Sequence, residues 1–361
     1  MTDRKINVLV AEDSPAARLL LIHLLESDPQ IRVIGAVSDG HAALDFVKHN
    51  KPDVVLIDIY MPHMDGFETT RRIMETQPVP IVICSAVANP KELATAFRSL
   101  EAGALACIEK PVGPEYADFD ATASHLLQTV KLMSEVKVVR RRPRSHQAPP
   151  ATAQAFGVES THASAQIKLI GIGASTGGPP ALHTVLSGLP KDFPVPVLIV
   201  QHIAYGFLPG MAEWLNQTTS MQVHIASYGT YPLPGHVYLA PDDFHLGMRA
   251  DGRILLTQAD AENGLRPAVS FLFRSLAEVY GANALGVLLT GMGNDGAAEL
   301  KLLKDKGAIT IAQDRESSVV HGMPGVAIAL GGATQVLPAD KIADALLTMV
   351  NRRNGIGATE K

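Results

Sequence analysis

The stretch IKLIGIGASTGGPP (167–180) joins an apolar run to a glycine-rich turn that ends in two prolines. The apolar run predicts a buried strand, and Pro179 and Pro180 suit the first turn of a helix, where a backbone N–H is not needed. A strand followed directly by a helix is typical of parallel sheets that are covered by helices. We therefore expect an α/β fold in this part of the chain.

Further apolar runs alternate with helical patterns on both sides of this stretch and form two series. The first series holds the runs at 6–11, 31–37, 53–58, 79–85 and 104–109. The second begins at 167–173 and continues at 195–201, 284–290 and 308–312. Five strands in the first series suit a doubly wound sheet. The 361 residues are also enough for two domains that each bury a core of their own.

The segment between the two series has a different composition. It holds a basic cluster at 140–144 and then a stretch rich in Ala, Pro, Ser, Thr and Gln. Such a segment buries too little apolar area to offset its chain entropy, which predicts an exposed linker. We place a first domain at 1–130, the linker at 131–166 and a second domain at 167–352.

Composition and charge argue against several function classes. The formal net charge of −5 gives no reason to expect a nucleic-acid partner or a membrane surface. No apolar run approaches the length of a transmembrane helix, and the N-terminus lacks the apolar core of a signal peptide. Cys84 and Cys107 are too few for a disulfide framework or a metal cage. We expect a cytoplasmic protein without membrane insertion.

Polar residues follow several strands of the first series, where ligands bind in parallel α/β sheets. Glu12 and Asp13 follow the first predicted strand, and Asp58 ends the third. Converging carboxylates repel one another, and Mg²⁺ prefers such hard oxygen ligands. Ser85 and Lys110, at the ends of the fourth and fifth strands, offer a hydrogen-bond donor and a positive charge for a phosphoryl group. Each residue alone is equally compatible with a helix cap or a surface charge, whereas their joint placement favours a phosphate switch.

The turn at 171–180 is the main catalytic candidate of the second series. Its spacing does not match a dinucleotide-binding G-x-G-x-x-G, but Gly173, Ser175 and Gly177 match G-x-S-x-G, which lifts a serine hydroxyl above a sheet. A glycine-rich turn capped by Ser175 is the alternative interpretation. His202 and Asp295 follow two further predicted strands and would meet Ser175 at one edge of the sheet, as base and orienting acid.

Residues 1 to about 130 resemble a response-regulator receiver domain. The matching residues are Glu12-Asp13, DIYMPHMDG (58–66), Ser85 and Lys110-Pro111. The resemblance implies that Asp58 accepts a phosphoryl group from a histidine kinase, with Mg²⁺ bound by Glu12, Asp13 and Asp58. It also implies a cis Lys110–Pro111 bond. Receivers usually carry Phe or Tyr three positions before the lysine, whereas this chain has Cys107.

The region from about 167 to 350 closely resembles the catalytic domain of chemotaxis protein-glutamate methylesterases. The matching motifs are GASTGG (173–178), VQH (200–202), GHVYLAP (235–241), LRPAVSFLFRSLA (265–277), LTGMGNDG (289–296) and HGMPG (321–325). The resemblance implies that Ser175 is the nucleophile, His202 the general base and then acid, and Asp295 the residue that orients it. Backbone N–H groups near Thr176 and Met292 are the implied oxyanion donors, and no cofactor is implied at this site. Ile203-Ala204 and His321 depart from the residues common in the family.

Together the resemblances imply two doubly wound three-layer α/β/α domains joined by a flexible linker, a flavodoxin-like receiver and a Rossmann-like methylesterase domain. They imply phosphorylation-activated hydrolysis of glutamate γ-methyl esters on methylated chemoreceptors, with release of methanol. Glutamine deamidation on the same receptors stays open. So do two other functions, a receiver-controlled interaction module at receptor arrays and a hydrolase of another ester.

Overall fold

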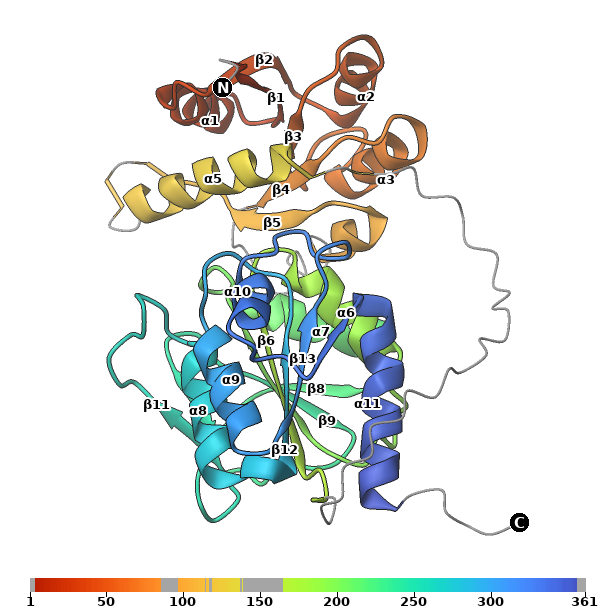
Figure 1. The fold of residues 1–361 in the computed structure, drawn as a ribbon. Coiled ribbons are helices and arrows are strands. Elements are labelled where there is room, and N and C mark those ends of the chain that lie inside the picture. Colours follow the sequence, from red (N-terminus) through yellow and green to blue (C-terminus); the bar gives the residue numbers. More distant parts are fainter. Residues whose placement is uncertain are drawn as a thin grey trace, which may run out of the picture.

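The computed structural model describes residues 4–85, 97–113, 115–116, 119–136, 138 and 165–355. The N-terminal sheet is fully parallel and has the strand order β2-β1-β3-β4-β5 (Figure 1). Its strands are β1 (Ile6–Ala11), β2 (Ile31–Val37), β3 (Val54–Ile57), β4 (Ile81–Ser85) and β5 (Ala106–Glu109). The helices are α1 (Pro15–Ser27), α2 (Gly40–His49), α3 (Gly66–Thr76) and α5 (Phe119–Ser134), and residues 97–102 are also helical. This is the doubly wound order of flavodoxin-like folds.

Acidic and hydroxyl side chains fix where the helices after β1, β2 and β3 begin. Ser14, Asp39 and Asp65 each accept a hydrogen bond from the backbone N–H three residues further on. These bonds satisfy N–H groups that have no partner within the first turn of a helix. The caps therefore fix where each loop that leaves the carboxyl edge of the sheet ends and its helix begins.

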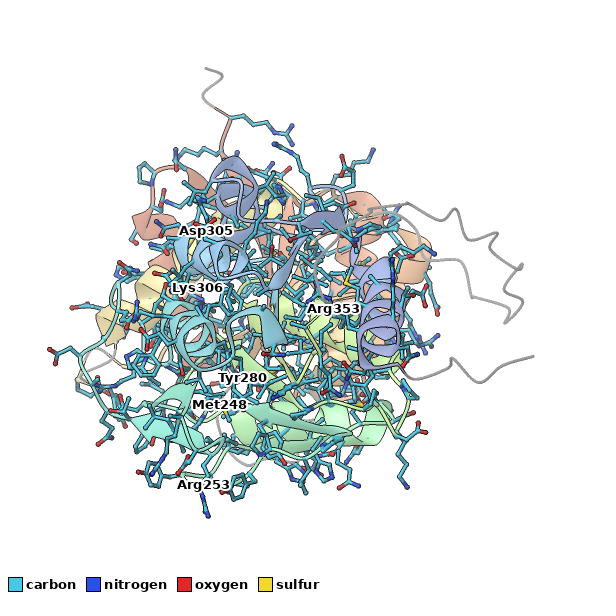
Figure 2. The ribbon with its side chains drawn as sticks, turned by 60° about the horizontal axis from the view of Figure 1, so that its bottom comes forward. Met248, Arg253, Tyr280, Asp305, Lys306 and Arg353 are labelled. Atoms are coloured by element: carbon cyan, nitrogen blue, oxygen red, sulfur yellow. The ribbon has the colours of Figure 1, made fainter. Side chains whose placement is uncertain are left out.

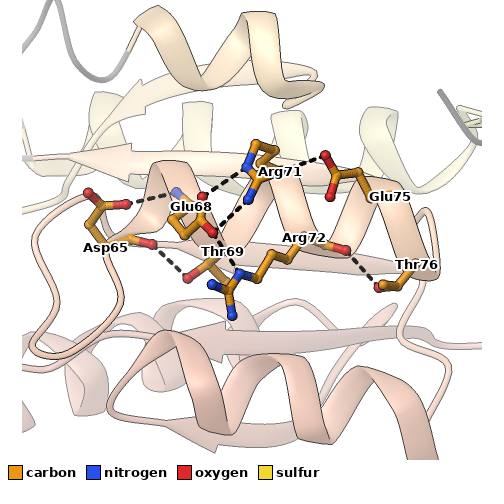
Figure 3. A network of polar contacts seen from close by, with 7 residues as sticks. All are labelled: Asp65, Glu68, Thr69, Arg71, Arg72, Glu75 and Thr76. Atoms are coloured by element: carbon orange, nitrogen blue, oxygen red, sulfur yellow. Dashed lines mark hydrogen bonds and ion pairs between the residues drawn. The ribbon is translucent and has the colours of Figure 1, made fainter. Parts of the chain in front are cut away.

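The solvent face of α3 carries a network of ion pairs (Figure 3). Glu68 accepts hydrogen bonds from Arg71 and Arg72, which lowers the pKa of Glu68 to about 2. All three side chains are partly exposed, and exposed ion pairs add little net stability. The network orders the surface of the helix, whereas the Asp65 cap positions its start.

The C-terminal sheet is also parallel and has the order β14-β13-β12-β6-β7-β9-β8. Its strands are β6 (Leu169–Ala174), β7 (Val197–Gln201), β8 (Gln222–Ile225), β9 (His236–Leu239), β12 (Ala284–Leu288), β13 (Ile309–Gln313) and β14 (Gln335–Leu337). An antiparallel hairpin of β10 (His245–Met248) and β11 (Ile254–Thr257) lies apart from it.

Helices cover both faces of this sheet, as Figure 1 shows. One face carries α6 (Gly178–Ser187), α7 (Leu208–Thr218) and α11 (Ala339–Asn354), and the other carries α8 (Val269–Val279), α9 (Ala297–Asp305) and α10 (Met323–Ala329). A short 3₁₀ helix, η1 (Gly281–Asn283), precedes β12. Successive residues of β7 alternate between the two cores, with Val197 and Ile199 in one and Leu198 and Val200 in the other.

The C-terminal end of α11 contacts the segments that precede β6 and β12. Arg353, labelled in Figure 2, donates to the backbone oxygens of Ala165 and Ala282, both at 3.3 Å. Asn354 exchanges hydrogen bonds with the backbone of Ile167, just before β6. The start of the domain is thereby tied to its last helix.

The structure confirms two α/β sheets with helices on their faces and corrects several details. Helix α5 continues to Ser134 and so runs past the predicted boundary at residue 130. Most of the predicted linker, 131–166, lies outside the described residues. The expected cis Lys110–Pro111 bond is wrong, because the cis bond among the described residues is Arg266–Pro267. Trans is the lower-energy form even before proline.

Candidate active site

Ser175 lies in the turn between β6 and α6, where the sheet ends. Its backbone N–H donates to Thr290 O at 3.0 Å, and its carbonyl accepts from Gly178 N at 2.7 Å. Gly177 adopts a left-handed conformation with φ of 76°, which side-chain-bearing residues rarely adopt. A Cβ at Gly173 would lie 2.3 Å from Val269. Gly177 is therefore required by its backbone conformation, and Gly173 by the close approach of the Val269 side chain.

His202 follows β7, the neighbour of β6. Its backbone N–H donates to Ala174 O at 3.0 Å, which places it beside the turn of Ser175. The Gln201 amide donates to Ser175 O at 2.9 Å and to His202 O at 2.8 Å. Because both partners are acceptors, this end of the side chain must be the NH₂ group. Gln201 thus links the backbones of the two predicted catalytic residues.

Asp295 is buried in the loop between β12 and α9. One carboxylate oxygen accepts from Val269 N at 2.6 Å and the other from Ser270 N at 3.0 Å. These N–H groups belong to the first turn of α8, where the helix dipole also favours a negative charge. The first of these oxygens lies 2.9 Å from His202 Nε2. That contact is short enough for an ion pair but lacks the geometry of a hydrogen bond.

These partners keep Asp295 in its charged form. Burial alone would raise the pKa of Asp295, but the interactions with His202 and Ser270 outweigh it and lower the pKa. A carboxylate that stays ionised can orient an imidazole and stabilise its protonated form. Asp295 therefore has the electrostatics that an orienting acid requires.

The structure brings Ser175, His202 and Asp295 together around one cavity of about 490 Å³. The hydroxyl of Ser175 makes no hydrogen bond to another described residue, so a serine–histidine bond is not formed in this arrangement. Catalytic hydrogen bonds are often long until substrate binds. Thr176 and Met292 line the same cavity, and their backbone N–H groups have no hydrogen-bond partner among the described residues.

The receiver forms the opposite wall of this cavity. Phe97, Leu100, Cys107 and His125 line it. Figure 1 shows the receiver across the end of the catalytic sheet, with β5 on the near side. The position where receivers usually carry an aromatic residue, here Cys107, thus faces the catalytic cleft. Burial raises the pKa of the Cys107 thiol to about 12, which makes it a poor nucleophile.

The acids predicted for the receiver site also lie together. Glu12, Asp13 and Asp58 each place a carboxylate oxygen within 4.8 Å of the others. Ser85 is buried at the end of β4, and its carbonyl accepts from Lys110 N at 2.9 Å. Three carboxylate oxygens at this spacing suit a hard divalent cation.

Lys110 provides the positive charge of this cluster. Its Nζ atom lies 2.7 Å from Glu12 Oε2 and 3.0 Å from Asp58 Oδ1. Burial raises the pKa of both carboxyl groups, and Lys110 offsets this only in part. Burial would lower the pKa of Lys110, but the two carboxylates raise it overall. The cluster carries more negative charge than its lysine balances.

The remaining histidines of interest have other surroundings. His245 is buried between Asp260 O and Ala268 N, a structural role that its hydrogen bonds explain. His321 is not among the residues that line the catalytic cavity, whereas Ile203 and Ala204 are. Of the two departures from the family pattern, the pair after His202 is therefore the one at the cavity.

Sequence reasoning did not single out Gln201, Val269 or Ser270, although all three hold the site together. Gln201 and Ser270 stand inside the quoted motifs 200–202 and 265–277. The available signal was the position of Gln201 at a strand end and of Ser270 at a helix start. Such a position does not reveal which atoms these side chains contact.

The fold and the site define a two-domain protein, in which a receiver-like α/β domain precedes a second α/β domain that carries a serine, a histidine and an aspartate around one cavity. Residues 8–117 match the family model of the response regulator receiver domain, and residues 170–346 match that of the CheB methylesterase. None of the helices among the described residues is long and apolar enough to cross a membrane.

Relatives of similar length match almost the whole of this chain. The protein-glutamate methylesterase/protein-glutamine glutaminase of Nitrosospira multiformis is 53% identical over 96% of this chain and 98% of its own. A protein of the same name from Geobacter metallireducens is 51% identical over 95% of this chain and 99% of its own. The chain belongs to the protein-glutamate methylesterase/protein-glutamine glutaminase family. The crystal structure of the Thermotoga maritima CheB methylesterase catalytic domain covers 51% of this chain and 100% of its own, with 42% identity and a TM-score of 0.50.

Proposed function

We propose that this chain hydrolyses glutamate γ-methyl esters on chemoreceptors and that its receiver controls this activity by phosphorylation. The main support is the cavity itself, because Ser175, His202 and Asp295 form one wall and the receiver forms the other. The names of its full-length relatives support the substrate class. Both names also include protein-glutamine glutaminase, so we extend the proposal to glutamine side chains on the same receptors. We place the reaction in the cytoplasm.

In the proposed reaction the Ser175 hydroxyl attacks the ester carbonyl while His202 accepts its proton. Because Nε2 of His202 faces Asp295, Nδ1 is the ring nitrogen left for this transfer. The N–H groups of Thr176 and Met292 stabilise the oxyanion. The histidine then protonates the departing methoxide, which leaves an acyl-enzyme and methanol. Water, activated by the same histidine, releases glutamate.

For the receiver we propose that a histidine kinase phosphorylates Asp58. Glu12, Asp13 and Asp58 would hold Mg²⁺, which neutralises their charge and the charge of the phosphoryl group. Ser85 and Lys110 would contact the phosphoryl oxygens. Phosphorylation changes the charge next to β4 and β5, and β5 lines the catalytic cavity. A shift of this strand would favour an arrangement in which the receiver no longer covers Ser175.

Methanol release from methylated receptor membranes tests the proposal. We expect release by the wild type, a rise with a small-molecule phosphodonor and Mg²⁺, and loss of at least about 10⁴-fold in Ser175→Ala. No release under any condition would favour a phosphorylation-dependent interaction module. Release from a small ester but not from receptors would favour a hydrolase of another ester.

A further inference from the structure

Trp214 on α7 is fully buried, and part of its surroundings comes from the receiver. Its indole N–H donates to Glu101 Oε1 at 2.7 Å. The ring stacks on Phe97 of the receiver, with centroids 5.6 Å apart, and on His183 of α6, with centroids 5.1 Å apart. Phe97 also meets the edge of Phe207, which precedes α7. We call the catalytic-domain side of this contact, His183, Phe207 and Trp214, the aromatic face.

The aromatic face is continuous with the catalytic cavity. Phe97 packs on it and also lines the cavity that contains Ser175, as does Leu100 one turn further along the same helical segment. Whatever occupies the aromatic face therefore also lies beside the nucleophile. If the receiver moves away, two aromatic rings lose their apolar cover and the indole N–H loses its acceptor. Buried aromatic surface and a buried indole N–H both favour a new partner.

The occupant in this structure defines the chemistry of such a partner. Residues 97–102 are helical, and Phe97, Leu100 and Glu101 stand at positions i, i+3 and i+4, which share one face of a helix. The segment thus presents an aromatic ring, a leucine and a carboxylate to the aromatic face. His183 Nε2 also lies 3.9 Å from the carboxylate of Glu101. The surface fits an amphipathic helix with apolar anchors and a carboxylate or amide acceptor.

We propose that the aromatic face is also the docking surface for the protein substrate, and that the receiver segment 97–102 occupies it in the covered state. The inference rests on the proposed function, which supplies a protein substrate that carries glutamyl side chains. Activation would then exchange one helix for another on the same face. Trp214 anchors the receiver before activation and the receptor after it.

Binding to methylated receptor membranes tests this inference in the full chain. Cosedimentation is measured in a Ser175→Ala background, so that substrate is not consumed, with phosphodonor and Mg²⁺ present. We expect Trp214→Phe, which removes the indole N–H, to weaken binding about tenfold. His183→Ala, a change at a partly exposed residue, should weaken it about threefold. Glu101→Ala is the matched control, because it breaks the same hydrogen bond from the side of the competing receiver and should not weaken binding.

The same substitutions with Ser175 intact separate a docking role from a purely interdomain one. Glu101→Ala and Trp214→Phe should both raise the unphosphorylated rate on a short peptide that carries a glutamate γ-methyl ester. Only Trp214→Phe and His183→Ala should raise KM for receptor membranes. If Trp214→Phe and Glu101→Ala behave alike in both assays, the docking surface is overturned. Loss of peptide hydrolysis in Trp214→Phe would indicate that this variant does not fold. In that case His183→Ala is compared with Glu101→Ala in the same two assays. Absence of methanol release from wild type contradicts the proposed function, whereas the binding assay still tests the docking surface.

Discussion

The acid cluster of the receiver and the Ser175 site stand at equivalent places, each at the carboxyl edge of a parallel sheet. Both contain a buried aspartate, but the pKa of Asp58 is raised and that of Asp295 is lowered. Burial raises the pKa in both, so the difference lies in the partners. Asp58 faces other carboxylates, one lysine and one backbone N–H group, whereas Asp295 accepts two backbone N–H groups and faces a histidine.

The comparison shows how the carboxyl edge of a parallel sheet can place a buried aspartate in two different electrostatic environments. Fixed backbone donors at the start of α8 stabilise a permanent negative charge on Asp295, and an orienting acid needs that charge. In the receiver cluster the backbone N–H groups of Ser14 and Ile59, together with Lys110, do not outweigh burial, and the pKa values of Glu12 and Asp58 stay raised. A cation or a covalent change at Asp58 is therefore favourable there. The neighbouring groups, more than burial, decide the direction in which the pKa of each aspartate shifts.

The largest expected effect separates the two aspartates by activity. Asp295→Asn should lower kcat for methanol release by about 10⁴-fold, because the amide cannot stabilise the imidazolium or select its tautomer. Asp58→Asn should leave the unphosphorylated rate unchanged and remove stimulation by phosphodonor. Steady-state rates with and without phosphodonor measure both. A phosphodonor response that survives in Asp58→Asn would contradict the proposed switch.

The receiver cluster should depend on Lys110 for stability. Lys110→Met leaves Glu12 and Asp58 without their shared cation, and breaking a buried pair costs about 3–5 kcal/mol. Mg²⁺ at about 100 times its Kd should restore about 2.7 kcal/mol. Urea unfolding with and without Mg²⁺ measures both effects.

Lys131→Met is the matched control for Lys110→Met, because Lys131 pairs with Asp28 at 2.7 Å near the surface. It should cost at most about 1 kcal/mol and show no dependence on Mg²⁺. Equal losses of unfolding free energy in the two lysine variants would contradict an excess of negative charge in the buried cluster.

The loop that carries Asp295 is held by the hydroxyl of Ser270, whereas the receiver cluster is held by the ammonium group of Lys110. Ser270 Oγ accepts from Gly296 N at 3.0 Å and donates to Glu299 at 2.8 Å, and so holds the loop that carries Asp295. Ser270→Ala leaves a buried N–H unpaired at a cost of about 1–3 kcal/mol. We expect kcat to fall about tenfold with KM unchanged, since the aspartate is less well oriented.

Ser275→Ala tests whether that loss is specific to the site. Ser275 lies on the same helix and exchanges hydrogen bonds with the backbone of Met248, away from the cavity. Its loss should cost similar stability without changing kcat. A similar fall in kcat for both serine variants would assign the effect to α8 as a whole.

The sequence predicted the strands and the residues at their carboxyl ends, because apolar runs and the topology of parallel sheets are local or general properties. Ser175, His202 and Asp295 meet for this reason. The short strands β8, β9 and β14 and the hairpin β10–β11 were not predicted, since three or four residues carry little periodicity.

Contacts between segments that are far apart in the sequence were also not predicted. The support of Asp295 by Ser270 depends on where α8 begins and how it packs on β6. The hydrogen bond from Trp214 to Glu101 joins two domains, and no spacing rule connects them. The cis Arg266–Pro267 bond was not predicted, and the expected cis Lys110–Pro111 bond was wrong, because the sequence does not encode which X–Pro bond is cis.

The smallest expected effect compares the two aspartates by the pH dependence of stability. The raised pKa of Asp58 means that the folded state binds its proton more tightly than the unfolded state. The charged form therefore destabilises the fold above the folded pKa, and this penalty disappears as pH falls below the unfolded value of about 3.9. For Asp295 the lowered pKa reverses the sign, so its stabilisation is present above about pH 3.9 and is lost as pH falls through the folded pKa.

Urea unfolding of the two asparagine variants against wild type, from pH 7 down to about pH 4, measures this difference. Asp58→Asn should be more stable than wild type at pH 7, with a gain that shrinks as Asp58 of the wild type becomes protonated. Asp295→Asn should be less stable than wild type throughout this range, because Asp295 keeps its charge. If both substitutions change stability in the same direction at pH 7, the opposite roles of burial and partners at the two sites are contradicted.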